Sequence, residues 1–145
     1  MTHQIRTVAV AICRAGNRIL LERGYDAVKD EHFYRAIGGG VEVGERAVDA
    51  AIREWREEFE LSLETPKLLG VLENFFTFEG RAGHEIVSVF EGQVCDRRLL
   101  EQDELETVDT DGAKHVAVWV SVEALRDGKT SLYPDGMLQL ILGAD

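Results

Sequence analysis

The sequence predicts an α/β or α+β fold, in which helices pack on the faces of a mixed β-sheet. Several β-like runs surround one strongly amphipathic central segment, and a further helical segment lies close to the last residue. The chain has 145 residues, of which 45% are hydrophobic and 30% are charged, and this balance suits one core. We therefore expect a single domain over residues 1–145.

The first elements form a predicted hairpin. Residues 7–12 and 18–21 are β-like runs, and Gly16-Asn17 between them tolerates the positive φ of a tight turn. A short aromatic and apolar segment over residues 32–37 comes next and stops at Gly38-Gly39-Gly40. Three residues without Cβ make regular structure unfavourable, so we expect a loop to start there.

The clearest helix is predicted over residues 45–59. Its apolar positions recur at spacings of four, three and four residues, which places Val48, Ile52, Trp55 and Phe59 on one stripe. We expect this stripe to pack against the sheet, with Trp55 as a packing residue.

Two β-rich runs follow the helix, over residues 67–78 and 84–94, with glycines between them that suit a hairpin loop. Residues 101–111 carry six acidic side chains and no basic one, which indicates a solvated loop or an edge segment. Residues 115–120 return to strand. Ser121 can cap a short helix through Leu125, and Pro134 can open a last helix that ends near Leu142.

Composition excludes several classes of protein. The formal net charge is 16 − 27 = −11, which disfavours general nucleic-acid binding because such a surface repels phosphates. No apolar run approaches the roughly 20 residues that span a bilayer, so we expect no membrane segment. Cys13 and Cys95 lie in apolar strand-like runs and are expected to be small buried hydrophobes. A reduced, cytoplasmic setting is the expectation.

Acidic residues gather on one face of the central helix. At about 100° per residue, Glu54, Glu57 and Glu58 share a face roughly 100° wide. Such a trio alone is usually a solvated face, but like charges at these spacings cost about 0.2–0.5 kcal/mol per pair. A divalent cation would remove that cost, and hard cations such as Mg²⁺ choose carboxylate oxygens. The glycines ahead of the helix could also bring backbone N–H groups close to an anion.

Two other phosphate motifs fail at this segment. Residues 39–46 have the glycine spacing of a P-loop, but Glu45 and Arg46 stand where Lys and Ser or Thr are required. A dinucleotide fingerprint that starts at Gly38 would place Val43 at its third glycine.

The segment instead fits the pattern G-x5-E-x7-R-E-U-x-E-E-x-G-U, where U is a bulky apolar residue. The matching residues are Gly39, Glu45, Arg53, Glu54, Trp55, Glu57, Glu58 and Leu61. The chain here resembles the Nudix hydrolase family, whose fold is an α/β/α sandwich with a mixed sheet. One position departs from the pattern, because Glu60 replaces a glycine that suits a left-handed residue at the end of the helix.

The resemblance implies hydrolysis of a diphosphate bond in a nucleoside diphosphate linked to another moiety. It implies that Glu54, Glu57 and Glu58 bind Mg²⁺, with Mn²⁺ as the alternative ion. Arg53 would orient a carboxylate, and Gly39 and Gly40 would contact substrate or hold the segment in place. The general base is either the glutamate that matches Glu54 or an acid beyond the motif, and the sequence does not choose between them.

Outside the motif, Glu104 is the first candidate for a distant acid and Asp111 its rival, although solvated charge is the commoner role for any one acid of this run. Arg35 could meet a substrate phosphate, and a surface ion pair is an equal alternative. Glu73 and Glu85 lie in β-rich runs, where an inward-facing acid needs a partner.

Histidines and aromatics outside the motif are given structural roles. His84 and His115 lack a partner at ligand spacing and are treated as strand residues. The aromatic run of Phe75, Phe76 and Phe78 could stack on a nucleobase, but such a run is more often core.

A second functional hypothesis is a Nudix-fold module that senses a nucleotide or binds a partner without turnover. The complete set of Arg53, Glu54, Glu57 and Glu58 argues against it. A simple binder of divalent ions is a third, and it would not require Gly39 or Arg53 at their spacing. The substrate is expected to be a small nucleotide-type molecule whose identity depends on loops outside the motif. The resemblance leaves the oligomeric state open between a monomer and a homodimer, since dimers are common in the family.

Overall fold

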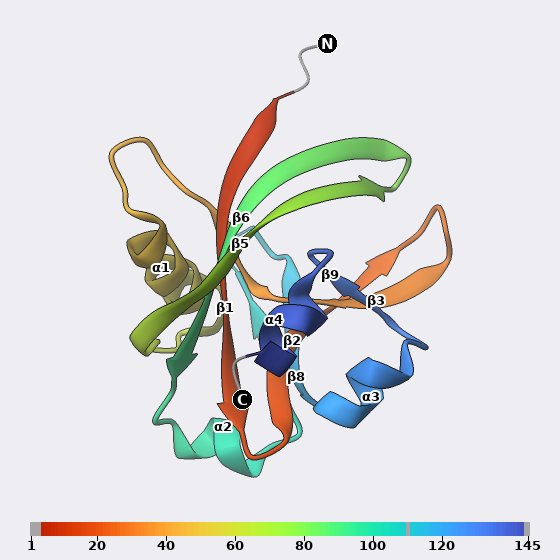
Figure 1. The fold of residues 1–145 in the computed structure, drawn as a ribbon. Coiled ribbons are helices and arrows are strands. Elements are labelled where there is room, and N and C mark those ends of the chain that lie inside the picture. The colour runs from red at the N-terminus through yellow and green to blue at the C-terminus, as the bar shows by residue number, and fades with distance from the viewer. Residues whose placement is uncertain (1–3, 110, 144–145) are drawn as a thin grey trace.

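The computed structural model describes residues 4–109 and 111–143 (Figure 1). Nine strands and four helices lie in these residues. The strands are β1 (Ile5–Ala15), β2 (Arg18–Asp26), β3 (Glu31–Arg35), β4 (Ile37–Gly40), β5 (Glu64–Phe78), β6 (Arg81–Gln93), β7 (Glu104–Val108), β8 (Lys114–Ser121) and β9 (Ser131–Tyr133). The helices are α1 (Ala47–Phe59), α2 (Arg97–Glu101), α3 (Val122–Asp127) and α4 (Met137–Gly143).

Strand β1 joins the two parts of the mixed sheet. It pairs in parallel with β6 and in antiparallel with β4, and its last two residues pair with the start of β2. Strand β5 extends the first part beyond β6. In the second part, β2 pairs with β3 and β8, while β9 and β7 add to their outer edges.

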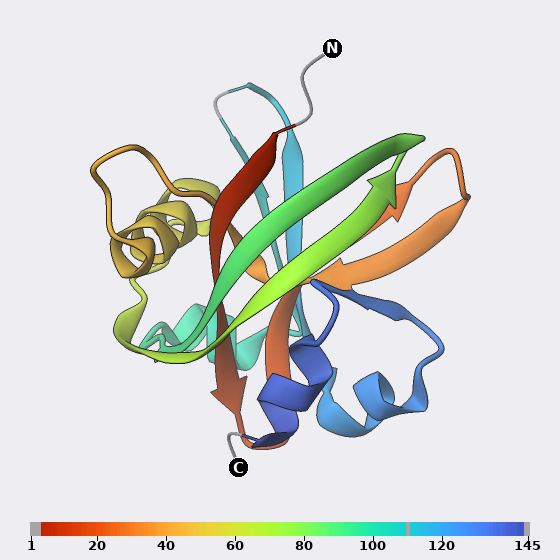
Figure 2. The ribbon, with the colours of Figure 1, turned by 45° about the horizontal axis from the view of Figure 1, so that its top comes forward.

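The helices lie on both sides of this sheet, as Figures 1 and 2 show. Trp55 and Phe59 of α1 and Leu99 of α2 belong to one buried cluster, and Leu125 of α3 and Ile141 of α4 belong to another. The predicted sandwich, a mixed sheet with helices on its faces, is confirmed. No helix in the described residues is long and apolar enough to cross a membrane.

Most predicted elements are present. The first hairpin turns at Gly16, β5 and β6 form the second hairpin, and Ser121 caps α3 by accepting a hydrogen bond from the Ala124 backbone N–H. Helix α1 begins at Ala47, two residues later than expected. Helix α4 begins at Met137 rather than at Pro134. The acidic run contains the edge strand β7.

The loop predicted from Gly38 is wrong, because Gly38, Gly39 and Gly40 form most of β4 and pair with Val10, Ala9 and Val8 of β1. A Cβ at Gly38 would collide with the Ala9 carbonyl oxygen, so the absence of side chains allows the two strands to approach closely. The loop begins only after β4.

Three further expectations need correction. Helix α2 and strand β9 were not predicted, because each is very short and carries no clear periodicity. Cys13 is buried as expected, whereas Cys95 lies beyond β6 and is exposed. The aromatic run of β5 is not core, since Phe75 and Phe78 are exposed.

Candidate active site

Helix α1 is held against β4 by its apolar stripe. Trp55 is completely buried, and its indole Nε1 donates a hydrogen bond to the Ile37 carbonyl oxygen at 3.1 Å. Phe59 is also buried, so the expected packing role of the stripe is confirmed. The acidic face of the helix is thereby fixed beside the glycine strand.

Arg53 connects this face to the segment that precedes the helix. Its guanidinium donates to both carboxylate oxygens of Glu45, at 2.9 and 3.0 Å, and to the Gly40 carbonyl oxygen at 3.0 Å. It also donates to Glu54 at 2.9 Å and to Glu57 at 3.2 Å. These planar, charge-assisted contacts explain why arginine suits this position better than lysine.

The Glu54 carboxylate lies directly against Gly39. A Cβ placed on Gly39 would stand 2.6 Å from the carboxyl carbon of Glu54, well inside van der Waals contact. Glycine at this position therefore gives the carboxylate its space, which is a requirement for close approach rather than for a turn.

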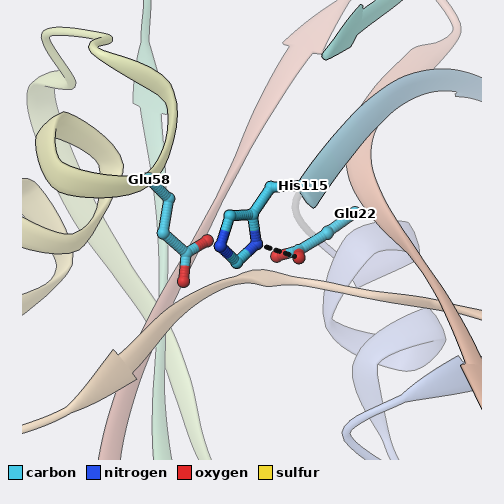
Figure 3. A group of neighbouring side chains, drawn as sticks. All are labelled: Glu22, Glu58 and His115. Carbon is cyan, nitrogen blue, oxygen red and sulfur yellow. Dashed lines mark hydrogen bonds and ion pairs between the residues drawn. The ribbon is translucent and has the colours of Figure 1, made fainter. Parts of the chain in front are cut away.

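Glu58 points toward Glu22 of β2 and His115 of β8 (Figure 3). Its carboxylate lies beside Glu22 and His115, and the ligand atoms of the three residues are all within 4.8 Å of one another. Glu58 Oε2 is buried without a hydrogen-bond partner. Burial, together with the nearby charge of Glu22, raises the pKa of Glu58 to about 8.

Glu22 is buried and lies at the centre of a chain of charged groups. It is 3% exposed and accepts hydrogen bonds from Arg35 at 2.8 Å and from His115 Nδ1 at 3.0 Å. Burial opposes its ionisation, but the Arg35 charge and these hydrogen bonds outweigh burial and lower the pKa of Glu22. The other ring nitrogen of His115, Nε2, lies 3.0 Å from Asp109 Oδ2.

His115 therefore has a carboxylate at each ring nitrogen. Burial alone would lower the pKa of His115, but the hydrogen bonds to Glu22 and Asp109 outweigh it and raise the pKa. Its contacts with Glu22 and Asp109 hold the ring in place, and His115 in turn holds Glu22 beside Glu58.

A cleft of about 370 Å³ opens between the two parts of the sheet, and Glu58, Arg35 and Gly39 lie in its wall. The volume falls within the range of small-molecule sites, about 300–1,000 Å³. Aromatic residues form much of the remaining wall, namely Phe33, Phe76, Phe78 and Tyr133. The Glu58 carboxylate of α1 thus meets an aromatic cleft whose wall also includes Gly39 of the glycine strand.

A model of the NUDIX domain family matches residues 3–140 of the chain. The chain belongs to the Nudix hydrolase family. The Nudix resemblance of the sequence is therefore confirmed. This family is a class of pyrophosphohydrolases. A search of the curated proteins found no match.

Solved structures agree with this Nudix assignment at the level of fold. The chain is similar to a NUDIX hydrolase from Nitrosomonas europaea, with 20% identity and a TM-score of 0.66 over 95% of this chain and 86% of that one. It is also similar to a MutT NUDIX hydrolase from Burkholderia pseudomallei, with 22% identity and a TM-score of 0.61 over 83% and 86%. The ORF135 protein of E. coli matches with 21% identity and a TM-score of 0.57 over 95% and 86%.

The structure divides the predicted metal ligands of the Nudix motif into two groups. Arg53 holds Glu54 and Glu57, whereas Glu58 faces Glu22 and His115. Divalent ions are typical of Nudix enzymes, and this donor set fits one, because carboxylate oxygens suit hard cations and one buried oxygen of Glu58 has no partner.

Of the predicted residues outside the motif, Arg35 lies at the cleft, whereas Glu104 and Asp111 do not. Arg35 lines the cleft and also pairs with Glu22, so both expected roles are compatible with its position. Glu104 is not brought to this site: it lies on the edge strand β7, 55% exposed, in an ion pair with Arg23. Asp111 is likewise exposed and is not among the residues of the cleft.

Sequence reasoning missed Glu22, His115 and Asp109. Glu22 directly follows the buried run of Leu20 and Leu21, and an acid on such a strand was a usable signal. His115 had no sequence neighbour at ligand spacing because its partner Glu22 is 93 residues away. The expectation that His115 is only a strand residue is therefore incomplete.

Proposed function

We propose that this chain hydrolyses a diphosphate bond in a nucleoside diphosphate linked to another moiety, with Mg²⁺ or Mn²⁺ as cofactor. The observation that carries the proposal is the Glu58 carboxylate, which lines the cleft and has one buried oxygen without a partner. Glu54 and Glu57 lie on the same face of α1, oriented by Arg53. The three glutamates would hold the ion.

The chemistry that such an ion supplies is neutralisation of charge on the diphosphate oxygens and acidification of a water molecule. The residues of the chain do the rest. Glu54 is our choice for the general base, because it lies against Gly39, a residue of the cleft wall, whereas Glu104 lies on an exposed edge strand and does not line the cleft.

Arg35 and the glycine strand would position the substrate. The Arg35 guanidinium is partly exposed in the cleft while one nitrogen holds Glu22, so its remaining donors can meet a phosphate oxygen. Gly39 lies in the wall of the cleft, and its missing side chain leaves space for the Glu54 carboxylate. His115 and Asp109 keep Glu22 charged and in place beside Glu58.

The acidic surface supports a small-molecule partner rather than a nucleic acid, since a net charge of −11 repels a phosphate backbone. A reduced, cytoplasmic setting, the single-domain extent and a homodimer stay predictions.

The test is hydrolysis of a panel of nucleoside diphosphate derivatives with Mg²⁺, comparing wild type with Glu57→Gln. Glu57 is exposed, so the variant should fold normally. We expect kcat to fall by about 10²-fold with a smaller change in KM, because charge stabilisation is expressed mainly in the transition state. The phosphate-containing products are separated and quantified by chromatography.

A matched control is Glu60→Gln, which makes the same chemical change at a residue outside the carboxylate face and should keep wild-type turnover. Wild-type rates in Glu57→Gln would sink the residue assignment. No cleavage across the panel, with nucleotides still raising the melting temperature, would replace the enzyme by the nucleotide-sensing module.

A further inference from the structure

The cleft contains a second polar group, distinct from the carboxylates of α1. Asn74, Glu85 and Arg6 lie in one row across β5, β6 and β1, since Glu85 is the register partner of both of the others. All three residues line the cleft. The aromatic residues Phe33, Phe76, Phe78 and Tyr133 line the same cleft.

Glu85 has acceptor capacity to spare. Its side chain is only 15% exposed, and its two contacts, to Arg6 Nη1 and to Asn74 Nδ2, are both long at 3.4 Å. A carboxylate offers about four acceptor positions, and poorly filled positions in a partly buried group favour binding of a donor. Asp26 of the same cleft differs, because it accepts from three backbone N–H groups at 2.9 to 3.1 Å.

Aromatic rings form part of the cleft wall and offer apolar surface to a flat ring. Phe33 makes edge-to-face contacts with Phe78 and Tyr133, with ring planes at 83° and 89°. The Phe76 ring lies against Gly83, at a place where any side chain would collide with it. Such walls stabilise a planar heteroaromatic group by stacking and by burial of its faces.

The spacing between this row and the glycine strand fits a nucleotide. Gly39 pairs with Ala9, and Glu85 pairs with Arg6, three residues away along β1. At about 3.3 Å per residue and about 4.8 Å per strand, Glu85 lies roughly 10 Å along β1 and two strands across from Gly39. Of the α1 carboxylates, Glu58 lines the same cleft as Glu85, so a ribose and its phosphates can connect a ring at Glu85 with Glu58.

We propose that Glu85 is a specificity residue that selects guanine, and that the substrate is a guanine-containing nucleoside diphosphate derivative. The proposal rests on the proposed function for the position of the phosphates. Guanine places two N–H donors, N1–H and the N2 amino group, side by side, and these match the two oxygens of a carboxylate. Adenine, cytosine and uracil each place an acceptor beside their donor, and a carboxylate repels that acceptor.

The test measures binding, so that it does not depend on turnover. Wild-type protein is titrated calorimetrically with GMP, IMP, AMP and UMP, which lack the diphosphate bond. IMP is the matched ligand, because it differs from GMP only by the N2 amino group. We expect GMP to bind about tenfold more tightly than IMP, within the range of about 5- to 150-fold that a bidentate pair supplies.

The protein variant is Glu85→Gln, which keeps the shape of the side chain and removes its charge. It should reduce the difference between GMP and IMP to less than about threefold. Glu73→Gln is the matched control, because Glu73 is exposed on the neighbouring strand β5 and does not line the cleft. This control should keep the full preference, and the melting temperature of each variant shows whether it has folded.

Equal affinity of wild type for GMP and IMP, a preference that survives in Glu85→Gln, or no binding of GMP would each overturn the proposal. If Glu85→Gln does not fold, the comparison of GMP with IMP on wild type still decides. Hydrolysis of an adenine derivative without any GMP preference would overturn this inference and leave the proposed function standing. A GMP preference without any hydrolysis would support this inference and overturn the proposed function.

Discussion

The missing Cβ of Gly39 is the smallest feature on which the site depends. The Glu54 carboxylate occupies the space that a side chain at residue 39 would take. At Gly40, by contrast, a Cβ would meet only the flexible end of Arg6, at 3.1 Å. A side chain would therefore displace a carboxylate of the site at Gly39 but only a flexible surface group at Gly40.

Gly39→Ala should displace the Glu54 carboxylate and weaken Mg²⁺ binding and turnover by at least about tenfold, because small displacements at a reacting centre cost rate steeply. Gly40→Ala is the control and should keep most of both. Calorimetric Mg²⁺ titration and kcat/KM measure the effects. Equal losses in the two variants would show that general crowding of β4, rather than contact with Glu54, is responsible.

Glu60 carries the strain expected at the one departure from the Nudix motif. It ends α1 in the left-handed region, with φ 56° and ψ 34°. Glu60→Gly should raise the free energy of unfolding by about 0.5–1 kcal/mol, because glycine adopts this conformation without a Cβ penalty. Urea denaturation measures it, with Glu60→Ala as the control that should show no gain. A loss of stability in Glu60→Gly would mean that the Glu60 side chain contributes more than its backbone costs.

At the scale of elements, Glu58 is the point where α1 meets β2 and β8. Its pKa of about 8 lies above its ordinary value of 4.5, so the folded protein holds this proton more tightly than the unfolded chain does. This stabilisation is fully present below about pH 4.5 and is lost as the pH rises to about 8. The raised pKa of His115 also lowers the free energy of unfolding as the pH rises. The lowered pKa values of Glu22 and Asp109 lower it as the solution becomes more acidic.

The free energy of unfolding of the metal-free protein should therefore fall between pH 5 and pH 8. Glu58→Gln should flatten this dependence, because the proton no longer exchanges at this site. Glu57→Gln is the control, since it removes the same charge from an exposed neighbour. Urea denaturation in a chelator at constant ionic strength measures the slope. An unchanged slope in Glu58→Gln would assign the pH dependence to other groups.

The sequence predicted elements whose signals are local. The stripe of Trp55 and Phe59 is a property of one segment, so α1 could be placed within two residues of its start. Strand β4 could not, because its glycines have no strand preference and are ordered by pairing with β1. The same holds for the site: the motif on α1 was readable, but Glu22 and His115 meet only because β2 pairs with β8.

At the scale of the whole molecule, an excess of 11 negative charges is carried by 145 residues, and a divalent cation binds against this background. Mg²⁺ should raise the melting temperature, because a ligand that binds only the folded state stabilises it by about 2.7 kcal/mol at 100 times its Kd. For a chain of this size that corresponds to roughly 5–10 °C.

The measurement compares metal-free protein with and without millimolar Mg²⁺, and KCl of equal ionic strength controls for screening of the acidic surface. The rise should be much smaller in Glu58→Gln. A flat melting temperature in wild type would show that the ion binds only together with the substrate.

The pairing of β1 with β6 also determines when the protein can fold. Residues Ile5 to Cys13 pair in parallel with His84 to Gly92. Strand β1 can therefore complete this pairing only after a segment 79 residues further along the chain has been synthesised. On the ribosome, neither α1 nor the hairpin that follows β1 can complete the core before β6 has emerged. Because such long-range pairing is slow to form, the apolar face of β1 stays exposed in the nascent chain until β6 is available.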